Sequence, residues 1–368
     1  MDRQAKAVVC REWGKPVQVE TITVEGPKRG EITIKVAACG VCHSDLSATT
    51  GKIPYPPPLV LGHEAAGVVV EVGEGVTDFQ EGDHVVSSFI SMCGKCRQCV
   101  RGRPVLCENA RKAMFNLPDG TVRTKDANGE PLNVFGACGV MAEFATMHVD
   151  NCVKVDETVP MQNAALVSCA VMTGVGAVFN TAKLEPGSRA AVFGIGGVGL
   201  NAIQGCATAG AEMIVAVDNN PRKLEMAKEF GATHTININD VDDAAKAVKK
   251  LTGGVDYAFE CVGGGPVVEQ AYKSLGRGGT AVVVGVADPK DKTSLTTLTL
   301  PADERTLKGS WLGSARPQHD FPRILGLYKA GKLKLDELVT RTYPIEEAAQ
   351  AFDDMVAGKN ARGVIVFE

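Results

Sequence analysis

Hydrophobic and polar residues alternate over short runs in the first third of the chain. Three such runs cover residues 31–36, 68–72 and 83–86, and glycine-containing turns separate them. Alternation with a period of two places one face of a strand against a core and the other face toward solvent. Short strands with frequent turns predict a compact β-rich domain.

The pattern changes near Met172, where apolar segments begin to alternate with amphipathic ones. Predicted strands cover 190–193, 213–217, 255–259 and 281–284, and predicted helices cover 199–209, 221–230 and 266–275. This alternation is typical of a parallel sheet with helices on both faces. Two helices (321–330 and 346–355) and a strand (363–367) predict that the chain then returns to the first domain. We therefore predict an α/β protein with domains over 1–171 and 172–311 and a returning segment over 312–368.

Length and composition agree with a two-domain soluble enzyme. A chain of 368 residues exceeds the size at which a single core keeps growing. The net charge of −4, without a basic stripe, argues against nucleic-acid binding. The uncharged stretch 159–182 contains Pro160 and Asn163 and predicts a buried helix rather than a membrane span. Twelve cysteines without a signal-peptide core predict a reducing compartment, so we expect a cytoplasmic protein.

Four cysteines fall within fifteen residues in the spacing Cys-x2-Cys-x2-Cys-x7-Cys. They are Cys93, Cys96, Cys99 and Cys107. Four thiolates satisfy tetrahedral zinc and leave no coordination position open, which is typical of a structural site. Because the segment lacks hydrophobic periodicity, we expect metal binding rather than burial to order it. A disulfide-bonded loop is the alternative interpretation.

A glycine-rich run lies between a predicted strand and a predicted helix. It reads Gly194-Ile195-Gly196-Gly197-Val198-Gly199. This G-x-G-x-x-G spacing permits a tight turn and lets a pyrophosphate approach the N-terminus of the helix. Asp218 follows the next strand, where a carboxylate can bind a ribose and repel a 2′-phosphate, so we predict NAD rather than NADP. Lys223 and Arg222 lie beside this acceptor site, either contacting the cofactor or as solvated helix charges.

A second possible metal site is spread along the chain. Cys42 follows the strand predicted near 32–37, His63 opens another strand, and Cys169 lies on the uncharged stretch. Each residue alone is more typical of packing. Together, two sulfurs and one imidazole form a zinc site whose fourth position is open to substrate. Glu64 and Asp45 are candidate carboxylates that orient the ligands.

These motifs, in this order, resemble those of the medium-chain zinc-dependent alcohol dehydrogenases over essentially the whole chain. The resemblance rests on Cys42-His43-Ser44-Asp45, Gly62-His63-Glu64, the four-cysteine segment, Cys169 and the glycine run. It implies a GroES-like catalytic domain with one catalytic and one structural zinc, and a Rossmann domain that binds NAD(H). It also implies reversible hydride transfer between a small alcohol and NAD, with an aldehyde or ketone as the product. A homodimer is implied, with a tetramer as the alternative.

The resemblance assigns a role to each matching residue. The catalytic zinc ligands would be Cys42, His63 and Cys169, and the structural ones Cys93, Cys96, Cys99 and Cys107. Ser44 would begin a proton relay, and Arg362 would contact the pyrophosphate. Phe89 would line the substrate pocket and Val198 would pack behind the nicotinamide, with core packing as the alternative for both.

Two residues depart from the family pattern. His43 stands where many members carry an arginine that faces the pyrophosphate, and Ser47 stands where a relay histidine often lies. The relay therefore ends at His43, at solvent or at a group of the substrate. An exposed loop histidine is the alternative interpretation of His43.

The substrate class is left with several hypotheses. Arg111 matches an anion-binding arginine of the glutathione-dependent members, but Ile53 lies near the place of their acidic residue. A glutathione- or mycothiol-type thiol adduct is therefore the second hypothesis. A zinc-independent quinone or enoyl reductase and a non-catalytic NAD(H) sensor are further alternatives. The segment 117–133 is predicted as a long surface loop that borders the pocket mouth.

Overall fold

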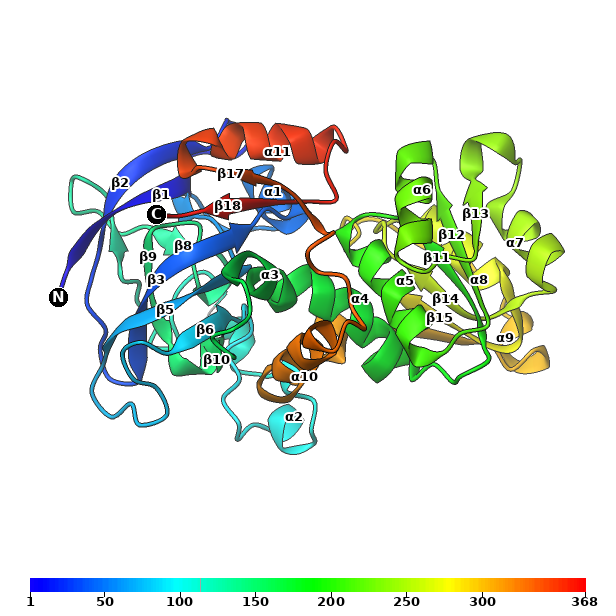
Figure 1. Ribbon diagram of the computed structural model, residues 1–368, viewed down its shortest axis with the longest axis horizontal. Coiled ribbons are helices and arrows are strands. Elements are labelled where there is room, and N and C mark those ends of the chain that lie inside the picture. The colour runs from blue at the N-terminus through cyan, green and yellow to red at the C-terminus, as the bar shows by residue number, and fades with distance from the viewer. Residues whose placement is uncertain (113) are drawn as a thin grey trace. The chain divides into compact units, whose positions relative to one another are not determined.

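The computed structural model describes residues 1–112 and 114–368, with the side chain of Arg111 also outside the described part, and it divides into two compact units (Figure 1). The first unit contains Met1–Cys169, Arg316–Lys329 and Leu335–Glu368. The second contains Ala170–Ala315 and Ala330–Lys334. The first unit is thus discontinuous in sequence, and the C-terminal segment completes it.

Two sheets form the first unit. The larger has the strand order β10-β6-β5-β3-β18-β17, with β9 also paired to β3, and the smaller has the order β7-β2-β1-β4-β8. The larger sheet contains β3 (Glu31–Gly40), β5 (Ala65–Val72), β6 (His84–Ser87), β9 (Phe144–His148), β10 (Cys152–Lys154), β17 (Val339–Tyr343) and β18 (Arg362–Val366). The smaller contains β1 (Arg3–Cys10), β2 (Gln18–Val24), β4 (Leu59–Val60), β7 (Thr124–Lys125) and β8 (Asn133–Val134). Pairing is antiparallel except between β17 and β18 and between β4 and β8.

The core of the first unit lies on both faces of β3. Ile32, Ile34 and Val36 alternate along this strand and are fully buried. Thr33, on the opposite face, is also fully buried, and its hydroxyl lies 2.8 Å from that of Thr146 on β9. Helices α1 (His43–Thr49), α2 (Arg97–Val100), α10 (Pro317–Lys329) and α11 (Ala348–Val356) complete the unit, and α11 lies beside β18 in Figure 1.

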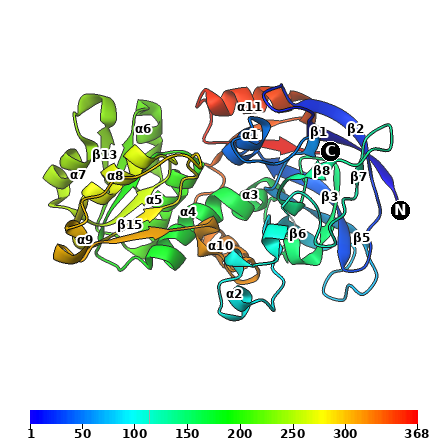
Figure 2. The same cartoon turned by 180° about the vertical axis from the view of Figure 1, so that it is seen from behind.

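The second unit is a six-stranded sheet in the order β13-β12-β11-β14-β15-β16. Its strands are β11 (Arg189–Phe193), β12 (Met213–Asp218), β13 (His234–Asn237), β14 (Val255–Glu260), β15 (Leu275–Val283) and β16 (Thr306–Gly309), all parallel. Its helices are α5 (Gly197–Ala209), α6 (Pro221–Glu229), α7 (Ala244–Thr252), α8 (Gly265–Lys273) and α9 (Thr299–Ala302). Figures 1 and 2 together show helices on both faces of the sheet. This is a doubly wound parallel sheet, which confirms the predicted fold class.

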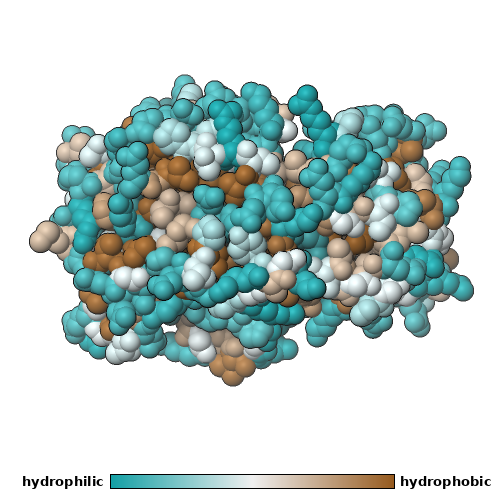
Figure 3. Space-filling view, viewed as in Figure 1, coloured by the Kyte–Doolittle hydropathy of each residue, from teal (hydrophilic) through white to brown (hydrophobic). Residues whose placement is uncertain are grey.

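One long helical stretch, Met161–Ala182, has the length and composition of a membrane span, and 78% of its most apolar window is buried inside the protein. It consists of α3 (Met161–Leu166), a π-helical turn (Val167–Val171), α4 (Met172–Gly176) and a second π-helical turn (Ala177–Ala182). Burial of this kind is expected of a core helix in a globular protein. The face shown in Figure 3 is mostly hydrophilic, with scattered groups of hydrophobic residues.

The expected long surface loop over 117–133 is wrong in part. Leu117 and Leu132 are almost completely buried, and residues 124–125 form β7 in the smaller sheet. Arg123 is also buried, because its guanidinium forms ion pairs with Glu31 and Asp119. Apolar side chains and a paired arginine therefore hold the segment against the first unit.

Candidate zinc and cofactor sites

The four cysteines between residues 93 and 107 come together in one lobe, which we call the four-cysteine site. Their sulfur atoms all lie within 4.8 Å of one another. The Cys93–Cys107 and Cys96–Cys107 sulfur separations are 3.6 and 3.9 Å. A tetrahedron with zinc–sulfur bonds of about 2.3 Å has edges of about 3.8 Å. The spacing therefore fits zinc, and it far exceeds a disulfide bond of about 2.05 Å.

Backbone amides of the same segment donate hydrogen bonds to the sulfurs of Cys93 and Cys96. The amide of Cys96 donates to the sulfur of Cys93 at 3.4 Å. Backbone hydrogen bonds from Cys99 and Glu108 lower the pKa of Cys96 to about 6. The thiolate, which is the form that binds metal, is thus favoured near neutral pH.

A second cluster, which we call the mixed site, contains Cys42, His63, Glu64 and Cys169. These four residues are buried, and their ligand atoms all lie within 4.8 Å of one another. Nε2 of His63 and Oε1 of Glu64 lie 3.9 Å apart, and both are buried atoms without a hydrogen-bond partner among the described residues. Buried polar atoms are normally paired, so this arrangement fits a metal ion.

Local backbone structure aims Cys42 and His63 at this site. Cys42 is the N-cap of α1, and its sulfur accepts from the amide of Ser44 at 3.4 Å. Gly62 has φ +94°, and a Cβ there would lie 2.2 Å from the backbone nitrogen of Met141, so the turn requires glycine. Asp45 accepts from the Gly62 amide at 2.9 Å and lies 3.4 Å from Nδ1 of His63. Asp45 therefore holds the imidazole with Nε2 toward the cluster.

Cys169 lies in the π-helical turn Val167–Val171. π-Helical turns occur often at functional sites, because the extra residue re-aims a side chain within a helix. Hydrogen bonding with Cys169 lowers the pKa of Cys42 well below its ordinary value. This favours the metal-binding thiolate of Cys42.

Glu64 forms a buried ion pair with Arg362 at the start of β18. Burial raises the pKa of Glu64, although Arg362 opposes the shift. Gly40 makes room for the pair, because a Cβ there would lie 2.4 Å from Glu64 Oε2 and 3.1 Å from the Arg362 guanidinium. Glu64 was expected only to orient ligands, whereas its oxygen lies among the potential ligand atoms. Arg362 was expected at the pyrophosphate, a contact that stays a prediction.

Two aromatic rings flank the imidazole of His63. The Phe89 ring lies 5.3 Å from it at 86°, and the Phe135 ring lies 4.9 Å from it at 64°. The Phe135 ring also packs against Tyr55, with the ring centroids 4.5 Å apart and the planes tilted by 46°. The family resemblance selected Phe89 but not Phe135, and neither residue belongs to a sequence motif. Apolar surface thus borders the mixed site on two sides.

Ser44 and His43 begin α1. The hydroxyl oxygen of Ser44 lies 3.6 Å from the sulfur of Cys42, so the structure brings Ser44 to the mixed site. His43 is exposed, as the alternative interpretation of a surface histidine expected. The pair therefore spans the distance from the buried cluster to the surface of the first unit.

The glycine run occupies the turn between β11 and α5, at the carboxyl end of the parallel strands. Gly194 has φ +91°, and a Cβ on Gly199 would lie 1.9 Å from the carbonyl oxygen of Gly194. A Cβ on Gly196 would meet nothing within 4 Å, so the turn is open there. Gly197 and Val198 start α5, whose N-terminal amides favour an anion. Tight turn, close packing and open approach are the three properties of a dinucleotide loop.

Asp218 ends β12 next to this turn. Its carboxylate accepts from the amides of Ile195 at 2.7 Å and Asn220 at 2.9 Å. Asp218 therefore links the glycine turn to the following strand, where the ribose-binding role was predicted. Lys223 lies in the first turn of α6 and is half-buried.

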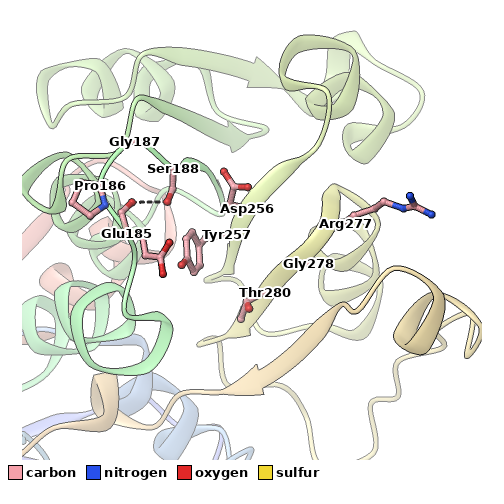
Figure 4. Close-up of a pocket in the computed structure, with 9 residues that line it drawn as sticks. All are labelled: Glu185, Pro186, Gly187, Ser188, Asp256, Tyr257, Arg277, Gly278 and Thr280. Atoms are coloured by element: carbon pink, nitrogen blue, oxygen red, sulfur yellow. Dashed lines mark hydrogen bonds between the residues drawn. The ribbon is translucent and has the colours of Figure 1, made fainter.

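A pocket of about 440 Å³ lies in the second unit. Figure 4 shows residues that line it, among them Ser188, Asp256 and Arg277. These residues lie at the amino ends of β11, β14 and β15. Ligands of open parallel sheets bind at the carboxyl ends of the strands. The pocket is therefore separate from the glycine turn, because the two lie at opposite ends of the strands.

Comparison with known families gives two matches along the chain. The alcohol dehydrogenase GroES-like domain matches residues 28–157, and the zinc-binding dehydrogenase family matches residues 197–330. The first match includes the four-cysteine site and three members of the mixed site. The second begins inside the glycine turn.

Individual proteins agree over full length. The NDMA-dependent alcohol dehydrogenase of Amycolatopsis methanolica is 42% identical over 371 residues, covering 99% of both chains. The S-(hydroxymethyl)glutathione dehydrogenase of Paracoccus denitrificans is 37% identical over 375 residues, covering 99% of this chain and 100% of that protein.

Two solved structures have the same fold over 100% of both chains. An alcohol dehydrogenase zinc-binding domain protein from Burkholderia ambifaria has a TM-score of 0.95 at 36% identity. The benzyl alcohol dehydrogenase of Acinetobacter calcoaceticus has a TM-score of 0.92 at 33% identity. With its two candidate metal sites and its glycine turn, the chain belongs to the medium-chain zinc-dependent alcohol dehydrogenase family.

Proposed function

We propose that this protein is a zinc-dependent alcohol dehydrogenase that reversibly transfers a hydride between an alcohol and NAD. The observation that carries the proposal is the buried meeting of Cys42, His63 and Cys169, with His63 Nε2 unpaired. A zinc ion held by these residues would act as a Lewis acid toward the alcohol oxygen. In the four-cysteine site, by contrast, all four positions of a tetrahedral ion would be filled by sulfur.

The residues around the mixed site would support proton removal and exclude water. Ser44 Oγ, close to the Cys42 sulfur, would take the alcohol proton and pass it toward His43 and solvent. Asp45 fixes the imidazole orientation, and Phe89 and Phe135 supply apolar walls. A dry, preorganised site strengthens each electrostatic interaction within it.

The second unit would bind the cofactor, whose nicotinamide accepts the hydride. The pyrophosphate would lie at the open turn around Gly196, with Arg362 as a further contact. Asp218 would accept hydrogen bonds from the ribose hydroxyls and disfavour a 2′-phosphate, so NAD is the proposed cofactor. Val198 would pack behind the nicotinamide and Lys223 would lie beside the ribose.

A thiol-adduct substrate is the second candidate. It is supported by the full-length similarity to an S-(hydroxymethyl)glutathione dehydrogenase. Ile53, an uncharged residue near the expected acidic position, favours a plain alcohol instead. Arg111, whose side chain lies outside the described part of the structure, would be the anion-binding residue in the thiol-adduct case.

The deciding experiment is a spectrophotometric screen for NADH formation, with the zinc content of the same sample measured by mass spectrometry. The panel contains aliphatic alcohols, aromatic alcohols and S-hydroxymethylglutathione, with NAD or NADP. NDMA is included as an alternative oxidant because one relative is NDMA-dependent. Turnover of simple alcohols with about two zinc ions per chain would support the proposal. One zinc per chain with quinone reduction would support a zinc-independent reductase, and NADH binding without turnover would support a sensor.

We also propose a cytoplasmic homodimer formed through the second unit, with a tetramer as the alternative. The end strand β16 supports this, since it lies at an edge of the sheet and Leu307 on it is 39% exposed. An apolar, unpaired sheet edge is a common site of chain association. Light scattering after size-exclusion chromatography would measure the mass directly.

A further inference from the structure

A short loop, Ser88–Ser91, carries Phe89 to the side of His63. We call it the Phe89 loop. It follows β6 and lies outside the strands of the sheet. Ser88 and Ser91 are nevertheless buried, at 0% and 6% exposure. Their polar groups therefore need partners inside the protein.

One buried residue, Asn151, supplies these partners at both ends of the loop. Its backbone oxygen accepts from the Ser88 amide at 2.7 Å, and its side-chain Nδ2 donates to the Ser88 carbonyl at 2.6 Å. Its side-chain Oδ1 accepts from the Ser91 hydroxyl at 2.5 Å. Asn151 is fully buried and lies just before β10, which pairs with β6. Asn151 thus bonds to both ends of the loop, to Ser88 through its backbone and side chain and to Ser91 through its side chain alone.

The other side of the loop is blocked by the backbone near Phe135. Gly136 has φ +61°, and a Cβ at this position would lie 2.7 Å from Cβ of Phe89 and 3.6 Å from Cβ of His63. Cys138, two residues later, donates from its thiol to the Ser88 carbonyl at 3.4 Å. The Cβ of Phe89 thus lies between the close backbone of Gly136 and the loop base that Asn151 holds.

We propose that Asn151 is a positioning residue that fixes the Phe89 ring and so sets which alcohols the site accepts. The inference rests on the proposed function, because Phe89 bounds a substrate space only if the mixed site acts on an alcohol. Asn151 acts through Ser88 and Ser91 rather than through the substrate. Without its side chain, the Ser91 hydroxyl loses this acceptor and the Ser88 carbonyl keeps only the weaker bond from the Cys138 thiol, so the ring can shift relative to the His63 imidazole. A shift of about 1 Å in a positioning group can change a rate by about a hundredfold.

The test compares Asn151→Ala with Thr33→Val, a matched loss of a buried hydrogen bond in the same unit, remote from the Phe89 loop along the chain. The readout is the ratio of kcat/KM for benzyl alcohol to that for 1-butanol, together with zinc content and melting temperature. We expect Asn151→Ala to change the ratio by about tenfold or more at unchanged zinc content. Thr33→Val should lower the melting temperature and leave the ratio as in the unmodified protein.

A double-mutant cycle with Phe89→Leu separates positioning from general damage. If Asn151 acts through the Phe89 ring, Asn151→Ala should have little further effect on the ratio once Phe89→Leu is present. Additive effects of the two substitutions would overturn the inference. Equal losses of kcat/KM for both alcohols in Asn151→Ala would overturn it as well.

Thiol labelling gives a readout that does not depend on turnover. Cys138 contacts the Phe89 loop, whereas Cys10 is buried in the smaller sheet. In Asn151→Ala, N-ethylmaleimide should modify Cys138 several-fold faster, as measured by peptide mass spectrometry, with Cys10 unchanged. A parallel rise at both cysteines would indicate global loosening and contradict the proposal. Should the unmodified protein turn over no alcohol at all, the proposed function fails, while the labelling still decides whether Asn151 holds the loop.

Discussion

The two candidate metal sites differ in where their ligand residues lie along the sequence. The four-cysteine site uses sulfur alone, from fifteen consecutive residues, and backbone amides of the same segment favour the thiolates of Cys93 and Cys96. The mixed site draws Cys42, His63 and Cys169 from distant segments, and all three are buried. Its orientation depends on Asp45 and on the Glu64–Arg362 pair. The ligands of a structural metal site can come from one short segment. A site that keeps one coordination position open depends on residues throughout the domain to orient its ligands.

The largest effect expected from this contrast is a loss of activity without loss of fold. His63→Ala removes the imidazole ligand of the mixed site, so kcat/KM should fall by about a thousandfold or more, since Lewis-acid stabilisation contributes several kcal/mol. Zinc content should fall from about two to about one ion per chain. Circular dichroism and NADH affinity should stay close to those of the unmodified protein, and loss of NADH binding would contradict the site assignment.

Cys99→Ala should do the reverse, because it opens the closed four-cysteine site. Zinc binding in such sites is coupled to folding, so the variant should lose several kcal/mol of stability and become sensitive to chelators. The measurement is thermal unfolding with and without a chelator. Cys206→Ala, a buried cysteine of α5 outside both clusters, is the matched control and should cost only about 1 kcal/mol. Equal losses in the two variants would argue against a structural metal.

Arg123→Ala tests stability outside both clusters. Arg123 is 1% exposed and pairs with Glu31, which is 3% exposed. Removing the arginine leaves a buried carboxylate without its partner, which typically costs about 3–5 kcal/mol. Denaturant unfolding should show this loss with zinc content unchanged. Lys6→Ala, which breaks an exposed pair with Glu346, is the control and should leave the free energy of unfolding nearly unchanged.

Part of the Arg123 contribution should depend on pH. Burial alone would raise the pKa of Asp119, but the hydrogen bond from Arg123 and those from Thr121 lower it to about 2. A carboxyl whose folded pKa is depressed contributes stability above its unfolded pKa of about 4 and loses it as pH falls toward 2. The stability difference between the unmodified protein and Asp119→Asn should therefore shrink between pH 4 and pH 2. A constant difference over that range would contradict the pairing.

The smallest expected effect concerns cofactor choice. Asp218→Gly removes the carboxylate that would repel a 2′-phosphate, so the ratio of kcat/KM for NAD to that for NADP should fall by about tenfold. Because Asp218 also accepts from the Ile195 amide, Asp218→Asn is the control that keeps an acceptor at this position. Unchanged discrimination in Asp218→Gly would defeat the predicted ribose contact.

Local periodicity predicted most of the fold. The helix expected over 199–209 is α5, Gly197–Ala209, and the closing strand expected over 363–367 is β18, Arg362–Val366. The helix expected from residue 321 begins earlier, at Pro317, because proline is well suited to the first turn of a helix. The prediction for 117–133 failed because its turn residues masked the burial of Arg123 and Leu132, which depends on partners distant in sequence.

In the candidate sites too, features that are continuous in sequence could be predicted, whereas contacts between distant residues could not. Spacing alone predicted the four-cysteine cluster and the glycine turn, since both are continuous in sequence. The Glu64–Arg362 pair joins residues 298 positions apart, and no local sequence pattern predicts it. Phe135 and Asn151 also lack a motif, because their importance comes from packing against His63 and from bonds to the Phe89 loop.

The place of β18 has a consequence for biosynthesis. This strand lies between β3 and β17 in the larger sheet, so the sheet stays incomplete until residues 362–366 have left the ribosome. The second unit, nearly all of which is translated as one stretch, can fold while synthesis continues. A nascent chain would thus carry a folded second unit while the first unit still lacks β18. Premature termination near residue 360 should therefore release a chain with an unfinished, association-prone sheet edge.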